Sequence, residues 1–210
     1  MFSSAIHSCR SALRIAVVSL FLIQPALGAT RAPATPTPHN LATTHGRLYA
    51  VFRHLNEARW VSVGHGPRVM YVFFDPNCPY CHYLYSVSQQ FVRSGQIEVR
   101  WIPLGLLTPS SEGKAAAILE AKNGPEALAK NEDRYHRPGG GGIRKILPTQ
   151  SVRNQLRKNL ALFHQVGAGV VPLLVWEDDA GHIRDQVGAV DRQTFAYLIR
   201  HVRPAGPEHP

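Results

Sequence analysis

The hydrophobic positions follow helix or strand periodicity from about residue 47 to residue 203. Over 47–59, apolar residues recur at i, i+3, i+4 and i+7, the spacing of one helix face, so the sequence predicts an amphipathic helix. Six consecutive apolar residues at 69–74 lie between Gly-Pro and Asp-Pro, a pattern typical of a strand buried on both faces. A second strand is predicted over 97–102.

Helices separate and follow these strands. One helix is expected between them, ending at Ser94-Gly95, and a helical insertion is expected at about 104–148, where strong helix formers are frequent. A long helix is predicted over 149–166. Two further strands, at 170–176 and 182–188, are joined by a turn of hairpin length, and a last helix follows them.

This order of elements defines a fold class. A helix between the first two strands implies a parallel pair with a right-handed crossover, and the short turn between the last two implies an antiparallel pair. The sequence therefore predicts an α/β domain over 60–203, with a mixed sheet flanked by helices. The polar, Pro-rich residues 204–210 are expected to form a disordered tail.

The N-terminal segment has a different pattern. Arg10 and Arg14 precede a short apolar run at 15–23, and small residues follow, which is the order of a secretory signal peptide over 1–29. Residues 30–46 are rich in Pro and Thr and predict a linker that leads into the helix at 47–59. Export would place the protein in an oxidising compartment.

Removal of the signal peptide changes the charge and the cysteine count. Loss of Arg10 and Arg14 lowers the net charge by two, from +9 to +7. Cys9 is lost as well, which leaves Cys78 and Cys81 in an oxidising compartment. The basic charge is compatible with acidic partners, but no run interleaves aromatic and basic residues, so nucleic acid is not an expected partner.

Cys78 and Cys81 allow several interpretations. A structural bridge between them would close a very short loop and constrain the unfolded chain little. A zinc site would need further ligands besides these two cysteines. The exported chain has no third cysteine and no closely spaced pair of histidines, so no metal is expected. The stretch Cys-Pro-Tyr-Cys-His also matches the attachment signature of c-type haem, with His82 as the axial ligand.

A catalytic dithiol agrees best with the surrounding pattern. Cys78 follows a buried strand and opens a helix, so its sulfur would lie near unpaired backbone N–H groups that favour the thiolate. Cys81 is one turn further on, and Pro79 suits the first turn of a helix. Asn77 is a suitable helix cap, and Asp75 with the proline after it would form the turn out of the strand.

The stretch "YVFFDPNCPYCHYLY" resembles the active-site segment of thioredoxin-fold Dsb proteins, in particular the DsbC/DsbG branch of thiol:disulfide interchange proteins. Its CPYC motif is most similar to the DsbG members of that branch. The segments "SGQIEVRWIPLG", "SSEGKAAAILEAK", "GAGVVPLLVW" and "QVGAVDRQTF" continue the resemblance in the same order, so that it covers about 60–202.

The resemblance implies roles for individual residues. Cys78 and Cys81 would form the redox-active disulfide, and Pro172 would be a cis-proline facing it. Pro79 and Tyr80 within the motif, together with Val171 and Pro172, would contact substrate. Asp75 and His82 would support the dithiol. A valine at 171 departs from the threonine usual in this branch and resembles the DsbA branch instead.

The expected activity is that of a periplasmic protein disulfide reductase or isomerase without a cofactor. A DsbA-like oxidase and a haem-binding electron carrier are the alternatives. Expected partners are exported proteins with cysteines or disulfides, and a reductant such as a DsbD-like membrane protein. Members of the branch carry a dimerisation domain before the linker helix, whereas 30–46 is too short to form one, so a monomer is expected.

Overall fold

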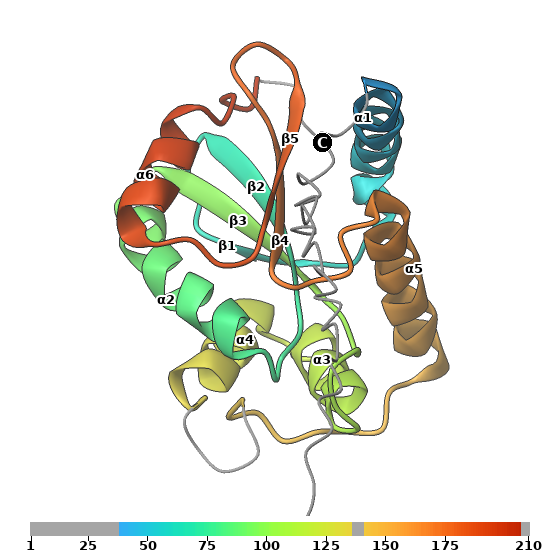
Figure 1. Ribbon diagram of the computed structural model, residues 1–210. Coiled ribbons are helices and arrows are strands. Elements are labelled where there is room, and N and C mark those ends of the chain that lie inside the picture. The colour runs from blue at the N-terminus through green and yellow to red at the C-terminus, as the bar shows by residue number, and fades with distance from the viewer. Residues whose placement is uncertain (1–37, 136–140, 207–210) are drawn as a thin grey trace, which may run out of the picture. The chain divides into compact units, whose positions relative to one another are not determined.

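The computed structural model describes residues 38–135 and 141–206 of the chain. Five strands form one sheet in the order β1-β3-β2-β4-β5 (Figure 1). They are β1 Val61–Val63, β2 Arg68–Phe74, β3 Ile97–Pro103, β4 Leu173–Glu177 and β5 Ile183–Val187. β2 and β3 are parallel, and the other three pairs are antiparallel. The predicted mixed α/β sheet is confirmed, including its parallel first pair and its antiparallel last pair.

Helices cover both faces of this sheet. α1 packs against α5 on one face, and α2 packs against α6 on the other (Figure 1). α3 and α4 form the expected helical insertion between β3 and α5. The helices are α1 Pro38–Arg53, α2 Pro79–Arg93, α3 Ser111–Leu119, α4 Gly124–Asp133, α5 Gln150–Val166 and α6 Arg192–Arg200, with a short 3-10 helix, η1, at Leu55–Glu57.

The central strand β2 is buried on both faces. The Phe73 ring lies 5.8 Å from the Phe163 ring of α5. On the opposite face, Phe74 packs edge-on against Trp101 at 5.5 Å, and Trp101 contacts Tyr85 of α2 at 5.6 Å. Successive side chains of a strand point to opposite faces, so a strand covered on both sides needs the continuous apolar run seen in the sequence.

Capping residues account for the ends of the later helices. The Thr149 hydroxyl accepts a hydrogen bond from the backbone N–H of Val152 at the start of α5, and Asp191 accepts one from that of Thr194 at the start of α6. α5 ends at Gly167, whose φ of +83° is a conformation that favours glycine. The bounds of α5 agree with the helix that the sequence predicts over 149–166.

The first helix differs from the expectation. α1 begins at Pro38, inside the segment 30–46 that was expected to be a linker, and it ends at Arg53, with η1 before residue 59. A proline does not prevent this start, because the first helical residues need no backbone N–H for the helix. The predicted signal peptide at 1–29 lies outside the described residues. In the described part of the chain, no helix is long and apolar enough to cross a membrane.

Two pairings within the sheet were also not foreseen. β1 has only three residues, too few for alternation to be recognisable in the sequence. Pro204 forms a bridge to Arg68, and the backbone N–H of Ala205 donates to the Pro67 carbonyl at 2.6 Å. The first residues of the segment expected to be a disordered tail therefore extend the sheet pairing beside β2.

Candidate active site

Cys78 lies where β2 ends and α2 begins. It is the N-cap residue of α2, and its Sγ accepts a hydrogen bond from the backbone N–H of Cys81 at 3.4 Å. Pro79 occupies the first helical position, as the sequence predicted. The expected cap, Asn77, does not have that role, because its side chain points into a polar network instead.

The two thiols have opposite acid–base properties. The side chain of Cys81 interacts with the Cys78 sulfur and lowers the pKa of Cys78 to about 7. Burial of Cys78 opposes this shift. The backbone N–H groups of Cys81 and Tyr80 lower the pKa further. Burial raises the pKa of Cys81 well above the ordinary value, and its interactions with Cys78 add to this. Cys78 is therefore the thiol that ionises near neutral pH.

A loop before β4 covers the dithiol. The Cys78 thiol donates to the Val171 carbonyl at 3.7 Å, and the Val171–Pro172 peptide bond is cis, the isomer expected from the resemblance. Cys78 is 3% exposed and Cys81 1%. Both thiols are therefore buried, and the loop before β4 contacts the sulfur of Cys78. Tyr80, by contrast, is 67% exposed.

Asp75 connects the end of β2 to the insertion. Its fully buried carboxylate accepts four hydrogen bonds. Oδ1 accepts from the Asn77 backbone N–H at 2.9 Å and from the Ser111 hydroxyl at 2.8 Å. Oδ2 accepts from the backbone N–H groups of Leu106 and Leu107 at 2.8 and 3.0 Å. Asp75 therefore organises the loop beyond β3 in addition to forming the expected turn.

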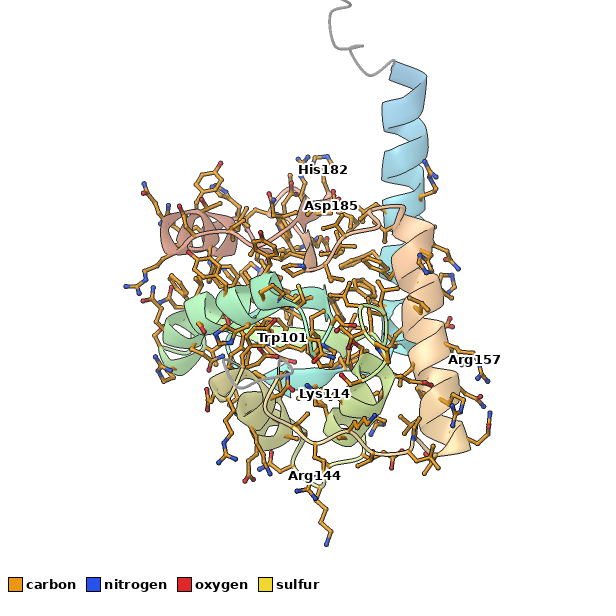
Figure 2. The ribbon with its side chains drawn as sticks, turned by 60° about the horizontal axis from the view of Figure 1, so that its bottom comes forward. Trp101, Lys114, Arg144, Arg157, His182 and Asp185 are labelled. Carbon is orange, nitrogen blue, oxygen red and sulfur yellow. The ribbon has the colours of Figure 1, made fainter. Side chains whose placement is uncertain are left out.

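A buried lysine lies behind this turn. Lys114 Nζ donates to Asn77 Oδ1 at 2.7 Å and to the Gly141 carbonyl at 2.8 Å. Figure 2 shows Lys114 within the molecule, whereas Arg144 points away from it. Burial lowers the pKa of Lys114, and the nearby charge of Asp75 opposes that shift. The turn that carries Cys78 is thus held by both a buried anion and a buried cation.

The end of the Gly-rich run packs against the same turn. Asn131 Nδ2 donates to the Pro76 carbonyl at 3.0 Å. A Cβ on Gly141 would lie 2.4 Å from that carbonyl oxygen and 2.2 Å from Asn131 Oδ1, so no larger residue fits. Gly142 is packed as well, because a Cβ on it would lie 2.7 Å from the Lys130 carbonyl oxygen.

His82 belongs to a cluster beside Cys81. Its Nδ1 lies 3.5 Å from Glu132 Oε2, and its ring stacks on Tyr135 with centroids 4.8 Å apart. The Tyr135 hydroxyl donates to the Asn77 carbonyl at 2.9 Å. Glu132 is 2% exposed, and burial raises the pKa of its carboxyl, while the interaction with His82 opposes the shift. As an axial haem ligand, His82 would have to bind iron through its ring, but this ring already contacts Glu132 and Tyr135.

Comparison with known proteins places this arrangement in a family. A model described as a thioredoxin-like domain matches residues 55–203, a range that includes all five strands and the helices from α2 to α6. The chain belongs to the thioredoxin-like domain family. The predicted fold is confirmed by this match.

Two curated relatives of this thioredoxin-like domain are thiol:disulfide interchange proteins named DsbG. The protein from Pseudomonas aeruginosa is 30% identical over 151 residues, which are 71% of this chain and 58% of the relative. The protein from Escherichia coli is 28% identical over 154 residues, 71% of this chain and 60% of the relative. The chain thus spans about three fifths of the length of these relatives. The predicted resemblance to DsbG is confirmed.

Solved structures agree with the fold. A linker-deletion variant of ScsC from Proteus mirabilis has a TM-score of 0.62 at 22% identity, over 76% of this chain and 82% of that one. A periplasmic thioredoxin-like protein from Salmonella enterica serovar Typhimurium has a TM-score of 0.59 at 21% identity, over 73% and 94% respectively. These structural similarities support a shared fold.

Several residues of the site were not foreseen from the sequence. Lys114, Asn131, Glu132 and Tyr135 all come from the helical insertion, which the sequence predicted only as a helical stretch without site residues. A polar residue at a core-facing helix position would have been the available signal, but helix periodicity there is weak. Within the described ranges of this thioredoxin-like domain, no group of three or more His, Cys, Asp or Glu residues could hold a metal.

Proposed function

We propose that the protein is a thiol:disulfide oxidoreductase acting on exported proteins through Cys78 and Cys81. The observation that carries the proposal is the pairing of one thiol whose pKa is about 7 with a second, buried thiol whose pKa is raised, three residues further along the same helix. The similarity to DsbG proteins supports it. Membership of the thioredoxin-like family alone would not support the proposal, because a protein can keep a fold after losing its catalytic chemistry.

The exchange proceeds in two steps. The Cys78 thiolate attacks one sulfur of a substrate disulfide, so that a Cys78–substrate bond forms, the substrate S–S bond breaks and one substrate thiolate leaves. Cys81 then loses its proton and attacks the Cys78 sulfur. The Cys78–Cys81 disulfide forms, the second substrate thiolate leaves, and two electrons have passed to the substrate. The same steps in reverse oxidise a substrate dithiol.

The second step requires an acceptor for the proton of Cys81. Glu132 interacts electrostatically with Cys81, and its carboxylate is paired with His82 on the helix that carries both cysteines. A buried carboxylate with a raised pKa is a suitable base because its pKa is nearer to that of the thiol. In this proposal Glu132 accepts the proton, and His82 orients the carboxylate.

Substrate would bind over the motif and the loop before β4. Tyr80 is exposed at the motif, and Val170 is 53% exposed next to the loop residue Val171. An extended segment that carries a disulfide could lie between these side chains, with its backbone along the loop. Substrate specificity would then depend on Tyr80, Val171 and Pro172, the residues that the resemblance implies for substrate contact.

The biological setting is proposed from the predicted signal peptide and the relatives. The protein would act in the periplasm, with a DsbD-like membrane reductant keeping the dithiol reduced. Reduction or isomerisation is the proposed direction, because of the similarity to DsbG proteins. The protein is proposed to act as a monomer, so that accessible disulfides would be exchanged more efficiently than scrambled ones are reshuffled.

Redox equilibrium with glutathione tests the proposal. The purified protein should form the Cys78–Cys81 disulfide reversibly, and it should catalyse reduction of a peptide disulfide by glutathione. Cys78→Ser should abolish this catalysis, while its circular dichroism stays that of the wild type. Catalysis that survives Cys78→Ser in a folded protein would refute the assignment. A preference for oxidising substrate dithiols would instead identify the DsbA-like alternative.

A further inference from the structure

A cavity lies beside the other end of β2 from the dithiol. It has a volume of about 200 Å³ and is walled by the end of α1, the first residues of β2, the middle of β3 and the segment after α6. Val69 and Tyr71 of β2 line it, whereas Cys78 follows the other end of that strand. Tyr71 lies three residues and Val69 five residues before Phe74, where β2 ends. At roughly 3.3 Å per residue, these lining residues are about 10 and about 16 Å from the end of the strand that leads to Cys78.

Three arginines from three different elements meet at this cavity. They are Arg53 of α1, Arg100 of β3 and Arg203 after α6, and the single carboxylate among the lining residues is that of Glu177. Glu177 is engaged by Arg203 in an ion pair with Nη1 and Oε1 2.5 Å apart. Arg53 makes no hydrogen bond or ion pair within the described part of the chain. Arg100 is paired in turn with Glu98, so Arg53 supplies the one positive charge at the cavity that no carboxylate of the described residues balances.

Arg100 is held rigidly in the wall. Its Nε donates to Glu98 at 2.9 Å and its Nη1 to the Tyr71 hydroxyl at 2.7 Å. The guanidinium lies 5.1 Å from the Trp60 ring centroid and 5.4 Å from that of Tyr71, which are cation–π distances. Two of the five N–H donors of Arg100 are used by these bonds, so donors remain for a ligand. The donors are fixed before any ligand arrives, which reduces the entropy lost on binding.

An aromatic surface adjoins these charges. Phe52 and Tyr71 line the cavity and pack edge to face, with ring centroids 6.1 Å apart. Trp60 packs on Tyr71 in the same manner at 5.8 Å. A flat apolar group can contact such rings, while guanidinium groups bind the planar oxygens of a carboxylate or the oxygens of a phosphate. Both features are within one small cavity.

We infer that this cavity is a binding site for a small organic anion, in which a carboxylate or phosphate contacts Arg53 and Arg100 and a flat apolar body contacts Phe52 and Tyr71. The site is separate from the dithiol and requires no redox chemistry. Its occupancy therefore does not depend on the proposed exchange activity. Arg53 is the residue that best tests it, because it lines the cavity without holding any other described residue in place.

Calorimetric titration of the purified protein would test the inference, using benzoate, phenyl phosphate, inorganic phosphate and the neutral benzamide as probes. About 150 mM salt would screen diffuse attraction to the basic surface. Benzoate or phenyl phosphate should bind at least about tenfold more tightly than benzamide, since charge-assisted hydrogen bonds are lost with the neutral probe. The tighter of these two anions identifies the oxyanion that the site prefers.

Variants make the test specific to the cavity. Arg53→Gln should weaken binding of the preferred anion about tenfold, the usual effect of one charged hydrogen bond. Arg144→Gln, which removes an equal charge from a side chain that points away from the molecule (Figure 2), should leave binding unchanged. The inference would be overturned if both variants weakened binding equally, or if benzamide bound as tightly as the anions. It would also be overturned if inorganic phosphate bound as tightly as phenyl phosphate.

Discussion

The two ends of the central strand β2 differ in how their charged groups are satisfied. At the dithiol end, Asp75 and Lys114 are buried and hydrogen-bonded to the turn before Cys78. At the other end, Arg53 is exposed with no described partner, and Arg100 has donors to spare. Buried charges with full sets of partners fix a geometry, whereas partly satisfied charges at a cavity are available to a ligand.

This difference has consequences for function. Thiol chemistry depends on the position of Cys78 to within a fraction of a hydrogen-bond length, so the groups behind it have a structural purpose. The helical insertion supplies most of them, through α3, α4 and the packed residues Gly141 and Gly142. We therefore expect substitutions at the dithiol end to affect both stability and exchange, and substitution of Arg53 at the cavity end to affect neither.

The largest expected effect is at Cys81. Cys81→Ser should abolish resolution, so that mixed disulfides between Cys78 and substrate accumulate, because attack by Cys78 still occurs but no thiol releases the product. The serine hydroxyl can still donate a hydrogen bond to the Cys78 sulfur. Non-reducing gels of cells that express this variant should show adducts that disappear on reduction. Their absence, with the variant folded, would contradict a catalytic dithiol.

Asp75 should have the next largest effect, on stability. Asp75→Ala removes an acceptor of four hydrogen bonds and leaves the buried Ser111 hydroxyl without this partner, so the free energy of unfolding should fall by about 3 kcal/mol. Asp185→Ala serves as the control, since Asp185 is exposed on β5 (Figure 2) and should change stability by less than about 0.5 kcal/mol. Urea unfolding of both variants measures the difference, and similar values would mean that Asp75 does not hold the turn.

Much of the difference between the two ends of β2 could not be predicted from the sequence. The strand, the dithiol helix and the caps follow from local patterns: the apolar run of β2, the Pro79 position, and Thr149 and Asp191 at helix starts. Partners such as Lys114 and Glu132 are distant in the chain from Cys78, and their burial depends on how the insertion folds back. The arginines of the cavity likewise come from three separate elements, which only the tertiary structure brings together.

Glu132 should affect the rate of resolution. In Glu132→Gln, release of a mixed disulfide should slow at least about tenfold, because the proton of Cys81 loses its acceptor. Loss of the negative charge also lowers the pKa of Cys81, which would speed the step, so slower release would identify proton transfer as the larger effect. Asp133→Asn, exposed on the same helix, is the control. Single-turnover kinetics decide between these effects, and an unchanged or faster release would exclude Glu132 as the acceptor.

The wild-type rate of resolution should also depend on pH in a defined direction. Glu132 can accept a proton only when it is ionised, so the rate should rise as the pH increases through its raised pKa and then level off. In Glu132→Gln this rise should be absent at that pH, and the rate should follow ionisation of Cys81 instead. Identical pH profiles for the two proteins would count against proton transfer to Glu132.

The smallest effect is expected when a substitution at the cavity end of β2 is tested for its influence on the acidity of Cys78. The rate at which iodoacetamide alkylates Cys78 should increase with pH to a midpoint near 7 and then level off, because only the thiolate reacts. Arg53→Gln should leave this midpoint unchanged, although it removes a positive charge from the protein. The separation along β2 of at least about 10 Å exceeds the Debye length of about 8 Å at physiological ionic strength, so the charge is screened. Lys114→Met, which removes the cation close to Asp75, should raise the midpoint, because the negative charge of Asp75 then acts on Cys78 with less compensation. A midpoint that shifts equally in both variants would show that net charge, and not the buried network behind the turn, controls the acidity of Cys78.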